Sequence, residues 1–285
     1  MALGLRRSST PIQAFRAAAL ALMGTLAAGT AWGQAAGGGS PRVAVWENLQ
    51  AATNSEGQTY LSDTSVALAL SQRVTLSAGL PIYDVPGGAG LGDIYARLNV
   101  ARPMSWATLG LQFTATAPTG NTSLGLSTGR FTGDFTGRLS RWLGPLHPFV
   151  AAGIANTVPE TLYYLRQYTS LGLVGHVEAG SGLWLTPTVS VGASGYDILP
   201  SGQQKIFSHG QNGATTGKGP AFLRAGETVG GADLARDDGV NAWAAWRPQQ
   251  GLALELSYSH SARYALNTVA ISLGYNLANL FGSSH

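Results

Sequence analysis

The chain has 285 residues, 39 of them glycine, and only 11% of its residues are charged. It contains no cysteine, which excludes disulfides, thiolate catalysis and cysteine-bound metals. The charged fraction is well below the roughly 25% of an average soluble domain.

The first 33 residues have the features of a secretory signal peptide. Three arginines occur within the first 16 residues, an apolar run follows at 17–26, and Ala31 and Gly33 provide small residues before a cleavage site. We therefore predict that 1–33 is cleaved and that 34–41 is a flexible lead-in. The alternative is a single anchoring helix, but the apolar run is shorter than the roughly 20 residues that span a bilayer.

Removal of this segment makes the remaining chain neutral. The whole sequence has 17 Lys and Arg against 14 Asp and Glu, and three of the arginines lie in the signal, which leaves 14 of each sign. The basic character therefore belongs to the cleaved segment, and we expect no binding to nucleic acid.

Beyond the signal, apolar residues alternate with small or polar ones. In 267–277, Val269, Ile271 and Leu273 occupy every second position. A period of two puts the two sets on opposite faces of a β-strand, and we expect the apolar face to contact lipid. The pattern predicts about twelve strands of membrane-crossing length, at 42–50, 61–71, 74–82, 92–101, 106–117, 131–141, 148–157, 168–179, 183–196, 237–246, 252–260 and 267–277.

The links between these strands alternate in length. Short links are predicted at 72–73, 101–105, 142–147, 180–182 and 247–251, and longer ones at 51–60, 83–91, 118–130, 158–167, 197–236 and 261–266. Short periplasmic turns that alternate with long extracellular loops are typical of outer-membrane barrels. The alternation holds only if 42–50 is a strand, which supports this less regular first segment.

A soluble β-sandwich would also show alternating strands. The export signal, the loop asymmetry and the low charge together favour a membrane barrel. We therefore predict an all-β, transmembrane, antiparallel up-and-down β-barrel over 42–285, in the outer membrane of a Gram-negative bacterium.

The longest link, 197–236, is rich in Gly, Gln, Ser and Thr. Such a segment is typical of a mobile extracellular surface loop. The alternative is a loop that folds inward and constricts a pore.

Strand parity predicts which polar residues face the lumen. They carry both signs of charge, whereas an ion-selective pore favours one sign at its constriction. Either they form a ladder of salt bridges that stabilises a narrow barrel, or they line the path of an uncharged or weakly polar solute. The candidates are Asp93, Arg97, Asn99, Gln112, Asp134, Arg138, His176, Glu178 and Glu255.

An enzymatic alternative is an outer-membrane lipid hydrolase, which needs a Ser and a His on the lipid-facing surface. Ser259, His260 and Ser261 are the candidates, but Ala262 stands where the His-x-Ser-Asn pattern of outer-membrane phospholipase and lipid A deacylase has serine. We therefore predict no catalytic residues and no enzyme activity.

We also predict no cofactor and no metal. His176 and Glu178 are two ligand types on one strand, too few for a closed metal site. The glycine-rich segment Gly90–Asp93 enters a strand rather than a helix, so it does not predict phosphate binding.

Three motifs resemble a known family. They are Arg73–Pro81 (RVTLSAGLP), Gly90–Asp93 (GLGD), and Ala117–Asn121 (APTGN) followed by Ser127–Gly129 (STG). In these motifs and in layout the sequence is similar to the proteobacterial outer-membrane family of meta-pathway phenol-degradation proteins, often simply called transporters. The resemblance implies a barrel that passes hydrophobic or aromatic compounds and has no catalytic residues.

We therefore predict an outer-membrane channel or transporter for passive passage of small solutes, hydrophobic or aromatic ones included. Its partners would be outer-membrane lipid, the solute and, during biogenesis, the barrel-assembly machinery. The second hypothesis is a structural or adhesive barrel that binds partners through its extracellular loops, and the third is the lipid hydrolase.

Overall fold

The structure is a computed structural model that describes residues 42–55, 57–85, 87–158, 165–166, 168–208, 227–249 and 252–276. The predicted signal peptide and lead-in lie outside the described residues. No helix in the described part of the chain is long and apolar enough to cross a membrane.

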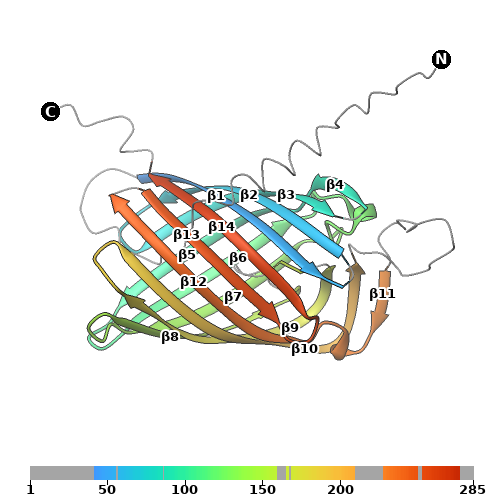
Figure 1. Cartoon of the computed structure of the whole chain (residues 1–285). Coiled ribbons are helices and arrows are strands. Elements are labelled where there is room, and N and C mark those ends of the chain that lie inside the picture. Colours follow the sequence, from blue (N-terminus) through green and yellow to red (C-terminus); the bar gives the residue numbers. More distant parts are fainter. Residues whose placement is uncertain are drawn as a thin grey trace, which may run out of the picture.

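Twelve strands of the described chain form a closed antiparallel barrel, as the alternation predicts (Figure 1). Barrel strands that follow one another in the chain are paired, and β14 closes the barrel on β1, where Leu273 lies opposite Glu47. Closure leaves no free sheet edge, so the backbone polar groups of the wall are satisfied within it. The strands are β1 (Arg42–Asn54), β2 (Gly57–Ala69), β3 (Val74–Val85), β5 (Ile94–Pro103), β6 (Thr108–Ala117), β7 (Thr132–Ser140), β8 (Leu146–Ala155), β9 (Tyr168–Trp184), β10 (Val189–Ser208), β12 (Asp237–Gln249), β13 (Leu252–Ser261) and β14 (Leu266–Asn276).

Two further short strands mark one end of the barrel. β4 (Gly88–Leu91) pairs with β3, and β11 (Glu227–Gly230) pairs with β10, both at the same end (Figure 1). The connections there also contain two 3-10 turns, η1 (Thr122–Leu124) and η2 (Ala232–Leu234). The opposite end has short turns such as 70–73, so we assign it to the periplasm and the elaborated end to the extracellular side.

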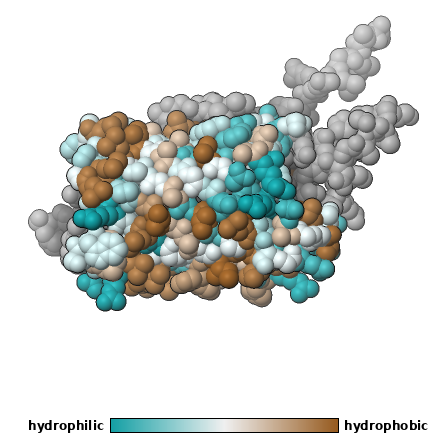
Figure 2. Space-filling view, turned by 90° about the horizontal axis from the view of Figure 1, so that it is seen from below, coloured by the Kyte–Doolittle hydropathy of each residue, from teal (hydrophilic) through white to brown (hydrophobic). Residues whose placement is uncertain are grey.

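The outer wall is apolar because every second residue of a strand points away from the barrel. In β14 the side chains of Thr268, Ala270 and Ser272 are buried, whereas Val269 between them is 40% exposed. Figure 2 shows hydrophobic residues spread across one face of this wall, interspersed with weakly polar ones. Contact with lipid accounts for so much exposed apolar surface, which includes Val66, Leu76, Leu98, Phe113, Phe135, Val150, Val177, Val240 and Leu256.

One predicted turn is wrong. β9 continues through 180–182 to Trp184, and the chain turns at 185–188. The glycines here allow close approach of neighbouring strands, because a Cβ on Gly180 would lie 2.4 Å from the carbonyl oxygen of Ala193. The strand predicted at 183–196 is consequently displaced along the chain and becomes β10.

Three predicted long links are partly strand. β1 and β2 meet in a tight hairpin where Asn54 pairs with Gly57, so 51–60 is not an open loop. β3 and β4 form a hairpin within 83–91, and β10 and β11 occupy much of 197–236. The tips of these extensions lack the regular apolar period because they stand beyond the lipid-facing part of the wall.

Candidate functional site

Polar side chains gather on the inward face of the barrel. Their strands alternate between exposed apolar and less exposed polar positions, and both signs of charge are present. The structure brings most of these residues into contact with a polar or aromatic neighbour. Eight of the nine residues predicted to line the lumen lie at inward positions: Arg97, Asn99, Gln112, Asp134, Arg138, His176, Glu178 and Glu255.

An Asp–His pair links β7 and β9 inside the barrel. His176 Nε2 lies 2.8 Å from Asp134 Oδ2, and the Thr136 hydroxyl donates to the other carboxylate oxygen over 2.7 Å. The imidazole lies over Gly153, where a Cβ would come within 2.3 Å of Nε2. His176 thus pairs with Asp134 rather than with Glu178. No three metal-binding side chains come together in the described part of the chain.

An arginine and two aromatic rings form a second cluster. The guanidinium carbon of Arg138 lies 3.5 Å from the centre of the Phe149 ring, a close cation–π contact. Phe149 in turn packs against Trp243, with ring centres 6.3 Å apart. The sequence patterns single out neither ring, although both occupy inward positions.

Glu178 and Glu255 lie on the inward faces of β9 and β13. The Ser194 hydroxyl donates to Glu178 over 2.6 Å, and Asn241 Nδ2 donates to Ser194 over 3.2 Å. Glu255 is 1% exposed and lies opposite Ser272 of β14. The two glutamates are therefore part of the packed inner wall.

A third cluster joins β2, β5 and β6. The Tyr95 hydroxyl donates to Asp63 Oδ2 over 2.8 Å, and the Arg97 guanidinium lies 5.1 Å from the Tyr95 ring centre. Arg97 and Gln112 both approach the Thr114 hydroxyl at 3.4 Å. Asp63 and Tyr95 are absent from the predicted site, although their inward parity could have identified them.

Asp93 lies apart from these clusters, in the extracellular connection before β5. Its carboxylate accepts a hydrogen bond from the backbone N–H of Gly120 over 2.9 Å. The backbone N–H of Asn121 donates to the carbonyl of Leu91, so the motifs at 90–93 and 117–121 meet in one folded unit. Burial is the largest influence on Asp93 and raises its pKa above the ordinary value.

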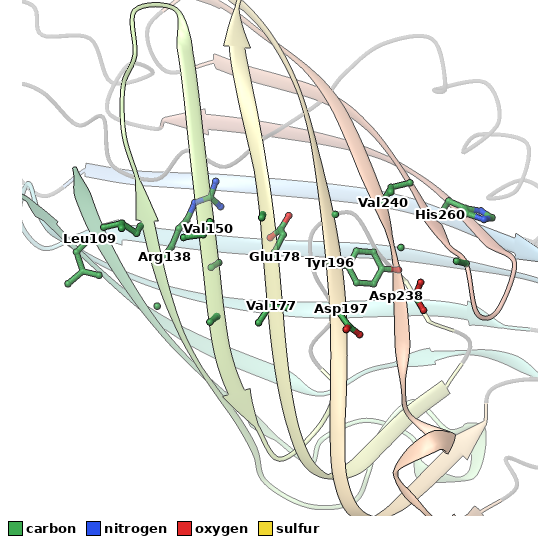
Figure 3. Close-up of a pocket in the computed structure, with 18 residues that line it drawn as sticks. Leu109, Arg138, Val150, Val177, Glu178, Tyr196, Asp197, Asp238, Val240 and His260 are labelled. Carbon is green, nitrogen blue, oxygen red and sulfur yellow. The ribbon is translucent and has the colours of Figure 1, made fainter. Parts of the chain in front are cut away.

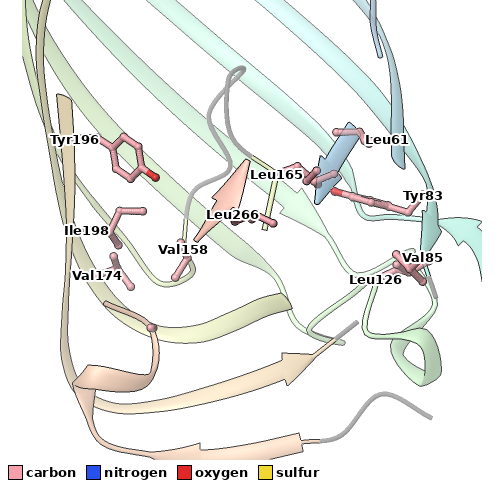
Figure 4. Packing of buried hydrophobic residues seen from close by; sticks show 12 residues of the cluster. Leu61, Tyr83, Val85, Leu126, Val158, Leu165, Val174, Tyr196, Ile198 and Leu266 are labelled. Carbon is pink, nitrogen blue, oxygen red and sulfur yellow. The ribbon is translucent and has the colours of Figure 1, made fainter. Parts of the chain in front are cut away.

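The extracellular mouth is occupied by apolar side chains. Leu165, from the connection between β8 and β9, is fully buried there (Figure 4). In Figure 4 it lies with Leu266 between two groups of neighbours from opposite parts of the wall. The mouth therefore presents an apolar cluster above the polar clusters, comprising Ala52, Leu61, Tyr83, Val85, Leu126, Val158, Leu165, Val174, Tyr196, Ile198, Ala235 and Leu266.

A buried ion pair anchors this cluster. The Arg166 guanidinium lies 3.0 Å from Asp237 Oδ2, and both side chains are almost completely buried. Asp237 also accepts hydrogen bonds from the hydroxyls of Ser261 (2.6 Å) and Tyr196 (3.2 Å). The guanidinium further contacts the Tyr168 hydroxyl. Neither charge is in a predicted strand centre, so parity gives no signal for the pair.

A depression of about 780 Å³ lies on the outer wall rather than in the lumen (Figure 3). Ala179 and Gly195, both small, are among the residues that line it. Most of the residues that line it occupy outward positions, so it faces lipid, although the inward residues Arg138, Glu178 and Tyr196 also border it. Its outward residues follow one line of paired positions from β6 to β13, namely Leu109, Leu139, Val150, Ala179, Gly195, Val240 and His260.

The residues that the alternative hypothesis of a lipid hydrolase would use do not assemble. His260 points outward, and its Nδ1 lies 3.0 Å from the side-chain oxygen of Asn267. Ser259 and Ser261 are fully buried on the inward face, and Ser261 donates to Asp237. Neither flanking hydroxyl shares a face with the imidazole, so this segment lacks the nucleophile–base contact that a hydrolase needs.

A closed twelve-strand barrel with an apolar outer wall and a polar inner face is an integral β-barrel of the Gram-negative outer membrane. No family model matches the chain, and no curated protein is similar to it. Among solved structures, it is similar to an outer-membrane channel from Pseudomonas putida F1 (14% identity, 87% of this chain and 99% of that chain, TM-score 0.55). It is also similar to the NanC porin (9% identity, 81% of this chain and 98% of that chain, TM-score 0.50). At these identities the likeness concerns the fold.

Proposed function

We propose that the protein is an outer-membrane channel for passive passage of small solutes, with a preference for those that carry an apolar or aromatic group. The closed barrel and its likeness to a channel and a porin support a transport role. Passage down a concentration gradient requires no energy coupling.

The proposed preference for apolar solutes rests on the change from apolar to polar side chains along the barrel interior. A solute that arrives from outside meets the apolar cluster around Leu165 and Leu266. Below it, pairs such as His176–Asp134 offer polar groups that already contact one another. An apolar mouth favours a ring or alkyl group over a fully hydrated sugar or ion, because burial of apolar surface releases water.

An experiment can separate transport from preference. Full-length protein is placed in liposomes, and the entry of p-nitrophenyl glucoside and methyl glucoside is compared, since neither crosses lipid readily. We expect both to enter faster than in empty liposomes, with the aromatic glucoside ahead. Entry of neither solute would refute the channel.

Matched leucine variants test the role of the mouth. Leu165→Ala removes a fully buried side chain of the cluster, whereas Leu173→Ala removes one that is 51% exposed on the outer wall. We expect the first variant to reduce the advantage of the aromatic glucoside and the second to preserve it. Equal behaviour of the two variants would refute the proposed role of the cluster.

The second candidate is a structural or adhesive barrel, favoured by the hairpin of β10 and β11 beyond the barrel rim. Lys205 and Glu227 form a 2.6 Å ion pair across it. Replacement of 209–226 by a Gly-Ser linker tests this reading. If the protein is a channel, solute flux should persist after the replacement. If neither the full-length protein nor the variant without 209–226 shows flux, the adhesive barrel is favoured.

A further inference from the structure

One carboxylate lies on the lipid-facing side of the barrel wall. Glu47 occupies an outward position of β1, with Leu273 of β14 on one side and Thr64 of β2 on the other. It accepts hydrogen bonds from the hydroxyls of Ser62 (2.6 Å) and Thr64 (2.5 Å). Both hydroxyl residues also belong to the outward face, because Ser62 pairs with Ile82, which is 45% exposed.

The depth of this group is close to the middle of the membrane. Glu47 and Thr64 lie near the centres of two strands of 13 residues each. At a rise of about 3.3 Å per residue and a tilt of about 40°, the ends of these strands are roughly 12 Å or more away along the membrane normal. Phospholipid headgroups, which lie at the interfaces, are therefore too far away to reach the carboxylate.

No other ordinarily charged side chain lies at mid-strand on the outward faces of the described barrel strands. The remaining ones stand at strand ends or level with them, where water and headgroups are available. Asp197, within the long β10, is paired with Asp238 at the start of β12 and so lies at the extracellular rim. This set comprises Asp84, Arg102, Asp197, Lys205, Asp238 and His260.

The carboxylate has acceptor capacity to spare. A carboxylate can accept about four hydrogen bonds, and the two hydroxyls use two of them. The adjoining outward positions, Leu49, Leu80 and Leu273, are aliphatic and provide no donor. A ligand that completes this site must therefore bring a donor, preferably cationic, on an otherwise apolar body.

We infer that Glu47, Ser62 and Thr64 form a site in the outer wall for a lipophilic amine dissolved in the membrane. The ammonium N–H donates to the carboxylate, and the hydrocarbon part lies along the neighbouring leucines. A second copy of the chain is a poorer occupant, because its described outward faces carry no cation at this depth. The inference does not depend on transport through the lumen.

Carbodiimide labelling of the full-length protein in phosphatidylcholine vesicles tests the site. Dicyclohexylcarbodiimide partitions into lipid and modifies carboxyl groups there, whereas a water-soluble carbodiimide does not. Asp63 faces inward close to Glu47 in the sequence and serves as the internal control, resolved by fragment mass spectrometry. We expect the lipid-soluble reagent to modify Glu47 and the water-soluble reagent to spare it.

Three additives distinguish what the site recognises. N,N-dimethyldodecylamine carries a charge and an N–H donor, dodecyltrimethylammonium carries only the charge, and dodecanol carries only a donor. We expect the amine to slow labelling of Glu47 about tenfold relative to either comparator, as one charge-assisted hydrogen bond allows. The paired variant Ser62→Ala/Thr64→Ala should lose most of this protection, and heat-modifiable gel mobility confirms that it is folded.

Several outcomes would overturn the inference. Labelling of Glu47 by the water-soluble reagent would show that the group faces water. Equal protection by all three additives, or by none, would show that no amine is recognised. Protection that rises with the protein-to-lipid ratio in the absence of amine would identify a second copy as the occupant.

Discussion

Removal of the buried charge pair at the extracellular mouth gives a sharp test of what anchors this end of the barrel. Arg166→Met leaves the Asp237 carboxylate at the first residue of β12, where it cannot move out to water. Among the described residues, the hydroxyls of Ser261 and Tyr196 then remain as its partners. Loss of one member of a buried pair costs about 3–5 kcal/mol, and we expect Arg166→Met to fall in this range.

The reciprocal change should cost less. Asp237→Asn removes the carboxylate beside Arg166, but this arginine lies in a connection rather than in a strand. Its side chain can therefore leave the cluster, and the loss is limited to about 2 kcal/mol for hydrogen bonds to a charged group. The double variant Arg166→Met/Asp237→Leu should recover most of the stability, because no buried charge remains.

Equilibrium unfolding in guanidinium measures these differences, followed by tryptophan fluorescence of protein refolded in lipid vesicles. The Lys205–Glu227 pair on the extracellular hairpin provides the control: at 2.6 Å it is shorter, but both side chains are exposed to solvent. Lys205→Met should cost at most about 1 kcal/mol. If Arg166→Met costs no more than Lys205→Met, burial does not govern the strength of the mouth pair and the reasoning fails.

Further substitutions test three other parts of the barrel. Ile271→Arg should lower the free energy of unfolding in vesicles by about 2–4 kcal/mol, as arginine does at the midplane. Leu273→Arg should cost less, because position 273 pairs with Glu47 and the new arginine can contact its carboxylate. In the Glu47→Gln background the two arginine substitutions should therefore cost the same. The raised pKa of Asp93 means that its contribution to stability is complete below the ordinary value of 3.8 and is lost as the pH rises through the raised value. Thermal unfolding of Asp93→Asn should therefore show a flatter pH dependence than the wild type. Gly153→Ala should destabilise by about 1–3 kcal/mol in the same assay, since its Cβ would meet a paired imidazole and a strand carbonyl.

The strand positions could be predicted because lipid imposes one simple rule on the wall. Residues such as Val269 must be apolar, and their neighbours in the strand need not be, so the period of two is visible in the sequence. The alternation of short and long links supported the less regular segment at 42–50, which the structure confirms as part of β1. It fails where strands leave the lipid, as in the hairpin at Asn54 and Gly57.

Glycine was a poor guide to the turns for a physical reason. In a narrow barrel, large inward side chains need room, and a glycine on the next strand provides it. Trp243 lies over Gly192 and Trp46 lies over Gly274, each with a ring atom within 2.4 Å of where a Cβ would stand. The glycines at 180–182 belong to the same wall, and so did not mark a turn.

The contacts of the mouth could not be predicted from one sequence. Leu165 and Arg166 are in a connection, where no periodicity restricts which way a side chain points. Their partners Asp237 and Leu266 are roughly 70 to 100 residues further along the chain. Only closure of the barrel brings these segments together, so the cluster is a property of the fold as a whole.

Glu47 shows where parity and chemistry disagree. Parity alone assigns this residue to the lipid side, and the energetics of a charge in hydrocarbon oppose that assignment. The chain resolves the conflict with two hydroxyls on the adjacent strand, at Ser62 and Thr64, where the register delivers both to the carboxylate. A single misplaced acid would have no such neighbours, whereas three complementary polar residues each give up favourable contact with lipid. Polar residues at three adjacent lipid-facing positions are expected where the outer wall binds a ligand.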